Sequence, residues 1–263
     1  MPWFFTDEEI KNEKFNIDGE NARHISKSLR MKRGEKLTLV SPSKTQFDCE
    51  IDNISNELVG VKILEKKPCE NEPETQITLY QALPKSDKME FIIQKCVELG
   101  VYKIVPTISS RCVSRPDKKS LEKKLARWQK IAKEAAQQSR RGIIPEICEA
   151  VSFKQAVENS KENEQNIIFY ELGGESIKNI IENSRPKNIG IFIGSEGGFE
   201  QSEVDLALEN GARVATLGKR ILRAETAPLA ALSIIMYALG EMDDDAKTAG
   251  EFENDRNNLC TEN

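Results

Sequence analysis

The spacing of hydrophobic and polar residues differs between two parts of the chain. In residues 1–65, apolar and polar residues alternate over short runs separated by glycine, proline and asparagine turns, most clearly at 35–41, 45–54 and 57–65. This pattern is typical of a small β-barrel-like domain. The stretch 66–74 is charged, contains two prolines and has no apolar period, so it predicts a linker.

Beyond the linker, apolar runs alternate with segments of helical spacing. The apolar runs predict strands at 77–83, 101–109, 166–171, 189–194 and 213–218. The other segments predict helices at 86–100, 120–139, 175–184 and 202–211, and a last helix that begins near Thr226. Uniformly apolar strands between helices indicate an α/β fold with a mostly parallel sheet covered on both faces.

Three loops of this second part follow predicted strands and carry chemistry-bearing side chains. They are ALPKSDK at 82–88, IGSEGGFE at 193–200 and LGKRILRAETA at 217–227. In open α/β sheets, ligands bind at the carboxyl ends of strands, in the loops that lead into helices. We therefore expect the function to reside in these three loops.

The glycine loops do not match the common phosphate motifs. The glycines at 194, 197 and 198 do not fit G-x-G-x-x-G, and Gly218-Lys219 lacks the other residues of a Walker A motif. Glu196 would oppose a pyrophosphate and instead suits a ligand that is cationic or rich in hydroxyl and N–H donors. A tight turn with an exposed glutamate is the alternative interpretation of this loop.

The last predicted helix follows the third loop. Thr226 fits a helix N-cap, Pro228 fits the first turn and Gly240 fits the end of the helix. The run 229–239 is apolar on nearly every face, which predicts a buried helix. Three cations and a glutamate precede this helix, where desolvation is costly unless each charge has a partner.

The net charge of −5 is unevenly distributed along the chain. Residues 241–263 hold eight carboxylates against two cations, which leaves 36 basic and 35 acidic residues in 1–240. Within that body, 111–141 has eleven basic residues against three acidic ones, and 23–36 has six against one. A solvated charged face explains either patch alone, whereas two patches on two domains favour a nucleic-acid partner. The acidic tail predicts disorder.

Other features of the sequence narrow the class of protein. No stretch reaches the roughly 18 consecutive apolar residues of a membrane span, and the N-terminal segment lacks the character of a signal peptide. The six cysteines are scattered without a C-x-x-C pair, and His24 is the one histidine. We therefore expect free thiols, no metal site and a cytoplasmic location.

Five segments, taken together and in this order, resemble the 16S rRNA (uracil-N3)-methyltransferases of the SPOUT superfamily. They are RHISKSLRMKRG, QALPKSDKMEFIIQKCVELGV, RWQKIAKEAAQQSRR, IGSEGGF and LGKRILRAETAPLAAL. The resemblance implies a PUA-like RNA-binding β domain at 1–70, a SPOUT α/β domain with a deep trefoil knot at 71–241 and an acidic tail at 242–263. It also implies S-adenosylmethionine as cofactor, a homodimer, and methylation of N3 of the uracil at position 1498 of 16S rRNA within the small ribosomal subunit.

The resemblance also implies which residues form the cofactor pocket. Ten positions match: Leu172, Gly173, Gly194, Glu196, Gly197, Leu217, Gly218, Ile221, Leu222 and Ala227. This chain departs from the family pattern at Ser195, where a proline is common, and at Ala224, where a threonine is common. Neither departure removes a charge or a glycine.

Charge considerations suggest roles for the remaining site residues. Arg223 suits the stabilisation of negative charge on a uracil oxygen, and Glu225 suits a base or a partner that orients Arg223. We expect eight basic residues to contact RNA: Arg23, Arg30, Lys32, Arg33, Lys85, Arg111, Arg140 and Arg141. The alternative is a noncatalytic RNA-binding or ribosome-assembly factor, which would share the fold and the basic patches.

Overall fold

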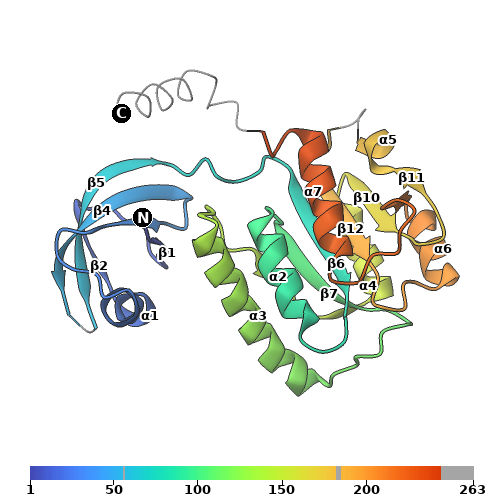
Figure 1. Cartoon of the computed structure of the whole chain (residues 1–263), viewed down its shortest axis with the longest axis horizontal. Helices are drawn as coiled ribbons and strands as arrows, with labels where there is room; N and C mark the ends of the chain where they lie inside the picture. The colour runs from blue at the N-terminus through green and yellow to red at the C-terminus, as the bar shows by residue number, and fades with distance from the viewer. Residues whose placement is uncertain (56, 182–184, 244–263) are drawn as a thin grey trace, which may run out of the picture.

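The computed structural model describes residues 1–55, 57–181 and 185–243. Its strands form a five-stranded sheet from the N-terminal part of the chain and an eight-stranded sheet from the rest (Figure 1). The predicted helix end at 182–184 and the predicted acidic tail, apart from its first two residues, lie outside the described residues.

The five-stranded sheet has the order β1-β3-β4-β5-β2. Its strands are β1 (Trp3–Phe5), β2 (Lys14–Ile17), β3 (Lys36–Val40), β4 (Thr45–Ile54) and β5 (Val59–Pro68). A short helix α1 (Gly19–Arg23) and a π-helical turn η1 (His24–Ser28) follow β2. The three predicted strands are confirmed as β3, β4 and β5, but β5 continues into the predicted linker. The strands β1 and β2 are too short to show a period in the sequence.

The short strand β1 contributes to two cores. Phe4 belongs to the core of the five-stranded sheet, whereas its neighbours Trp3 and Phe5 point to the other face and belong to the core of the larger sheet. This alternation follows from the period of two along a strand. Helix α3 (Lys118–Gln138) contacts β1 and lies on the side of the larger sheet that is nearest to the smaller one (Figure 1).

The eight-stranded sheet is parallel at every described strand pair, as the apolar runs predict. Its order is β11-β13-β10-β12-β6-β7-β8, with β9 also paired to β7. The strands are β6 (Gln76–Ala82), β7 (Lys103–Ile108), β8 (Glu146–Ile147), β9 (Val151–Ser152), β10 (Gln165–Phe169), β11 (Glu175–Ser176), β12 (Asn188–Ile193) and β13 (Arg213–Thr216). The five predicted strands are confirmed, and the three that the pattern missed have two residues each.

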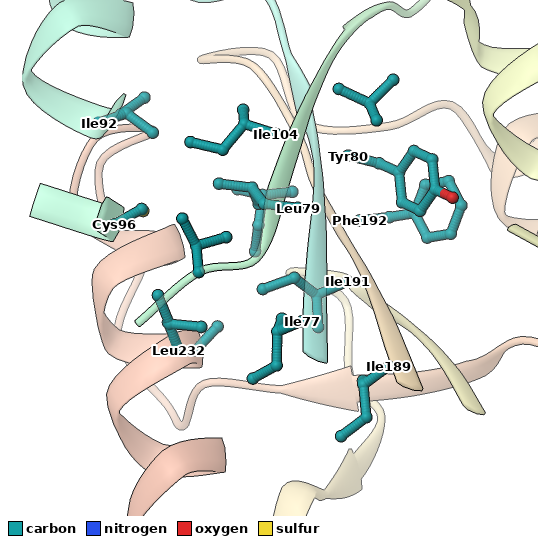
Figure 2. Close-up of a cluster of buried hydrophobic side chains, with 14 of the residues drawn as sticks. Ile77, Leu79, Tyr80, Ile92, Cys96, Ile104, Ile189, Ile191, Phe192 and Leu232 are labelled. Carbon is teal, nitrogen blue, oxygen red and sulfur yellow. The ribbon is translucent and has the colours of Figure 1, made fainter. Parts of the chain in front are cut away.

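Helices cover the larger sheet. Besides α3 they are α2 (Lys88–Glu98), α4 (Phe153–Asn159), the turn η2 (Ser160–Glu162), α5 (Ile177–Ile181), α6 (Gln201–Glu209) and α7 (Ala227–Leu239). Figure 2 shows Ile77, Leu79 and Ile191 on the face toward α2 and α7, and Tyr80 and Phe192 on the opposite face. The rings of Tyr80 and Phe192 stack at 4.5 Å between centroids. Both faces of the sheet are therefore buried.

Helix α7 begins and ends as predicted but is not buried on every side. Pro228 lies in its first turn, and Gly240 ends it in the left-handed conformation at φ 81°. Thr226 occupies the N-cap position, although its side chain makes no capping hydrogen bond. Ile234 and Tyr237 are exposed, the latter at 70%. The prediction of a fully buried helix is wrong because only one face of α7 packs on the sheet.

Candidate functional site

Four loops converge at one edge of the larger sheet. The strands β13, β10, β12 and β6 are consecutive neighbours and run parallel, so their carboxyl ends meet at the same edge. The loops after them surround a cavity of about 750 Å³. The three predicted loops are therefore brought together, and the loop that follows β10 joins them.

All ten residues expected to bind the cofactor line this cavity. They are Leu172, Gly173, Gly194, Glu196, Gly197, Leu217, Gly218, Ile221, Leu222 and Ala227. Arg223 lines it as well, with a side chain that is 83% exposed. Glu225 does not line the cavity, but it touches a residue that does. The sequence-based assignment thus selects residues from three loops that form one site.

The loop after β12 is a tight turn that needs glycine. A Cβ atom on Gly194 would come within 2.9 Å of the Cα atom of Gly198, closer than a Cβ contact allows. The amide of Gly198 donates to the carbonyl oxygen of Ser195 at 3.0 Å and closes the turn. The Ser195 hydroxyl donates to the carbonyl oxygen of Arg111 at 3.4 Å. Ser195 is therefore tied to the neighbouring loop.

A cluster of charges joins the loops. The ammonium of Lys88 lies 2.9 Å from Oε1 of Glu196 and 3.0 Å from Oε2 of Glu225. The other oxygen of Glu225 is 3.9 Å from the guanidinium of Arg223. The backbone amide of Lys85 also donates to Glu196, at 3.2 Å. Of the charges before α7, Glu225 and Arg223 therefore have partners, whereas Lys219 and Arg220 are exposed to solvent, where a charge needs none.

The cluster shifts the pKa values of its members. Burial alone would raise the pKa of Glu196, but the contacts with Lys88 and with the Lys85 amide outweigh it and hold that pKa below its ordinary value. Lys88 likewise lowers the pKa of Glu225. In return, Glu196 and then Glu225 raise the pKa of Lys88. Both carboxylates are thus ionised at neutral pH.

Lys88 is the functional candidate that the sequence did not single out. It is the first residue of α2 and lines the cavity. Its only signal in the sequence is its place at the end of the loop 82–88, at the carboxyl end of a predicted strand. The pairing with two carboxylates from distant loops could not be read from that position.

The residues expected to contact RNA fall into three places. Arg23, Arg30, Lys32 and Arg33 are exposed in the segment that follows β2. Lys85 and Arg111 are exposed beside the cavity, where the Arg111 guanidinium donates to the carbonyl oxygen of Gly197 at 3.0 Å. Arg140 is exposed after α3. These seven side chains are accessible to a polyanion.

Arg141 is not available for RNA, which corrects the prediction for this residue. Its side chain is 4% exposed, and its guanidinium forms a two-point ion pair with Glu72, at 2.6 Å and 3.1 Å. It also donates to the carbonyl oxygens of Val97 and Val101. Arg140 adopts a left-handed conformation at φ 58° and turns the chain, so that the next side chain points inward. The sequence shows two adjacent arginines but not this reversal.

The remaining predictions concern thiols, metals and membranes. The five described cysteines are unpaired, as expected. Among the described residues, no group of His, Cys, Asp or Glu is arranged to hold a metal ion. No helix in the described part of the chain is long and apolar enough to cross a membrane.

Comparisons with known proteins point to the RNA methyltransferases. Residues 70–236 match a family model described as an RNA methyltransferase domain, and 17–64 match an RNA methyltransferase PUA domain. The ribosomal RNA small subunit methyltransferase E of Bacillus subtilis is 37% identical over 229 residues, which cover 85% of this chain and 90% of that protein.

Two solved structures are similar over most of their length. One is a ribosomal RNA small subunit methyltransferase E from Neisseria gonorrhoeae bound to S-adenosyl methionine, 32% identical with a TM-score of 0.82. The other is a putative methyltransferase from Legionella pneumophila with bound SAM, 31% identical with a TM-score of 0.82. Each match covers 90% of this chain and 97% of the other. The chain belongs to the ribosomal RNA small subunit methyltransferase E family.

Proposed function

We propose that this protein transfers a methyl group from S-adenosylmethionine to N3 of the uracil at position 1498 of 16S rRNA in the small ribosomal subunit. One observation carries the proposal: loops from four adjacent parallel strands form a cavity lined by all ten residues expected to bind the cofactor. Family membership supports methylation of small-subunit ribosomal RNA, since the relatives' names state that activity, and two solved relatives are bound to S-adenosyl methionine.

The cavity has the size and chemistry that this cofactor requires. Its volume of about 750 Å³ lies within the range of small-molecule sites. Leu217, Ile221 and Leu222 provide apolar contacts for the adenine ring, and Glu196 provides a carboxylate for ribose hydroxyls or the sulfonium charge. When bound, S-adenosylmethionine supplies an electrophilic methyl group.

We assign Arg223 and Glu225 to the part of the site that receives the uracil, the acceptor of the methyl group. Loss of the N3 proton leaves negative charge on the uracil oxygens, and the Arg223 guanidinium at the mouth of the cavity stabilises that charge. Glu225 is a poor proton acceptor because Lys88 holds its pKa below the ordinary value. We therefore assign Glu225 the role of orienting Arg223. The N3 proton passes to solvent water at the open mouth of the cavity.

The noncatalytic alternative is not favoured. An RNA-binding factor would need the exposed basic residues, but it would not need a glycine-lined cavity with a paired carboxylate cluster beside it. The deciding experiment incubates the protein with S-adenosylmethionine and small subunits that lack the modification, then identifies the methylated nucleoside. We expect 3-methyluridine at one position; binding of subunits with no methyl transfer would instead favour the alternative.

The target base must be accessible at its N3 edge. That edge is used in base pairing, so the uracil must be unpaired or turned out of a helix. The seven exposed basic residues then hold the surrounding RNA through its phosphates. Four of them lie near the five-stranded sheet and two lie beside the cavity, so the proposed RNA path runs between these two places.

Binding to small subunits should depend steeply on salt. If about seven cations contact phosphates, affinity should fall by about 10³-fold between roughly 50 and 200 mM salt, because binding releases counterions. Filter binding or fluorescence anisotropy with purified subunits across that range measures the slope. A nearly flat salt dependence would contradict the assignment of these residues to RNA.

Gly218 and Gly211 offer a matched test of the cofactor site. Both have positive φ, 96° and 84°, and both face open space, but only Gly218 lines the cavity. Alanine at either position should introduce strain of about 1–2 kcal/mol. We expect only Gly218→Ala to weaken S-adenosylmethionine binding, by about tenfold, which corresponds to 1.4 kcal/mol. Calorimetric titration checks this; equal cofactor affinities for the two variants would contradict the site.

Further features of the family are part of the proposal. We assign 1–70 to an RNA-binding PUA-like domain and 71–241 to a SPOUT domain with a deep trefoil knot, and we place the protein in the cytoplasm. A homodimer is supported by Phe91, Ile234 and Tyr237, which are large, apolar and exposed on two helices that pack together, α2 and α7. Sedimentation analysis tests the dimer, and Tyr237→Asp should shift it toward monomer.

A further inference from the structure

Lys88 forms ion pairs with two loops at the cavity. Its ammonium contacts two carboxylates from different loops, Glu196 at 2.9 Å and Glu225 at 3.0 Å. Glu196 belongs to the loop after β12, and Glu225 belongs to the loop after β13, which carries Arg223 and five of the residues expected to bind the cofactor. One positive charge at the start of α2 therefore joins two loops of the cavity.

The two carboxylates need this charge. Both oxygens lie about 3 Å from the same nitrogen, so they are at most about 6 Å apart, a range in which like charges disfavour each other. The Glu225 side chain is 19% exposed, and solvent therefore screens it only in part. Without Lys88, repulsion would separate the two loops or force one carboxyl group to take up a proton.

We propose that Lys88 is a positioning residue for methyl transfer, which fixes Glu196 and Glu225 in one arrangement and thereby sets the Glu196 loop and the Arg223 loop together. This inference rests on the proposed function. Both contacts of Lys88 are with carboxylates, so it acts through them. Glu225 in turn lies 3.9 Å from Arg223 and orients it.

The surrounding charges define how the cluster titrates. Lys88 on α2 and Arg223 in the last loop face Glu225, while Lys88 and the Lys85 amide face Glu196. Three further charged residues line the same cavity: Glu171, Lys219 and Arg220. The pKa values of both glutamates are held below the ordinary 4.5, so the ion pairs are intact at pH 4.5 and above and are lost only as pH falls through the lowered pKa values.

Kinetics of Lys88→Met provide the first test. We expect kcat for methylation of small subunits to fall about 100-fold with little change in KM for subunits, because the reacting groups are misplaced while RNA contacts remain. Lys154→Met, which removes an exposed lysine from α4, is the matched control and should keep wild-type kinetics. A raised KM with wild-type kcat would overturn the inference, since that is the signature of a lysine that only binds phosphate.

A titration of the carboxyl groups tests the same inference without requiring activity. Carbon NMR of labelled glutamate side chains, assigned with Glu196→Gln and Glu225→Gln, should give midpoints below 4.5 for both residues in the wild-type protein. In Lys88→Met at least one midpoint should rise above 4.5, and Lys88→Arg, which keeps the positive charge, should return it below. Unchanged midpoints in Lys88→Met would overturn the inference even if the wild-type protein methylates RNA. Shifted midpoints with an inactive wild-type protein would instead contradict the proposed function.

Discussion

Arg223→Ala is expected to lower kcat for methyl transfer by about 10²–10³-fold, the usual cost of removing one group that stabilises a developing oxyanion. Arg223 lines the cavity with an exposed side chain whose partner is Glu225, so its guanidinium is available to the incoming base. Cofactor affinity should change little, because the apolar and glycine contacts remain. Single-turnover assays with saturating subunits, together with titration of S-adenosylmethionine, separate the two effects.

Arg220→Ala is the matched control for this experiment. It removes another exposed cation from the same loop, and we expect it to affect KM for subunits more than kcat. The comparison separates a general loss of positive charge from the loss of one specific group. A folded Arg223→Ala protein that binds the cofactor and methylates at the wild-type rate would exclude the proposed role.

Arg141→Met is expected to lower the free energy of unfolding by about 3–5 kcal/mol, because it leaves a partly buried carboxylate without its counter-charge. Glu72 would lose both contacts with the guanidinium, and the carbonyl oxygens of Val97 and Val101 would each lose one donor. Strand β1 at the N-terminus should be destabilised as well, since the indole N–H of Trp3 donates to the carbonyl oxygen of Arg141 at 3.0 Å.

Arg140→Met supplies the control because it removes the neighbouring, exposed arginine. Its effect on stability should be small, within the range of ordinary surface substitutions. Urea unfolding followed by tryptophan fluorescence measures both variants. In a double variant, Glu72→Gln should recover part of the stability lost in Arg141→Met, since the unpaired charge is then absent. Equal stability of the two arginine variants would contradict the buried ion pair.

The correction at Arg141 and the discovery of Lys88 have the same origin. Both side chains belong to stretches in which the sequence shows several nearby cations, and sequence spacing does not reveal which of them faces solvent. The left-handed turn at Arg140 directs the Arg141 side chain into the interior. The direct pairing of β6 and β12 brings the start of α2, and with it Lys88, beside Glu196.

The sequence by itself determined the two-part organisation of strands and the parallel character of the larger sheet, and its family resemblance implied ten residues that line one cavity. Hydrophobic periodicity is a local property, and loops after apolar strands are recognisable along the chain. Only the tertiary structure decided that four loops share one edge, that Lys88 joins Glu196 to Glu225, that Arg141 is buried and that α7 exposes Tyr237. Strand order and burial depend on contacts between residues far apart in the sequence, and no local pattern records them.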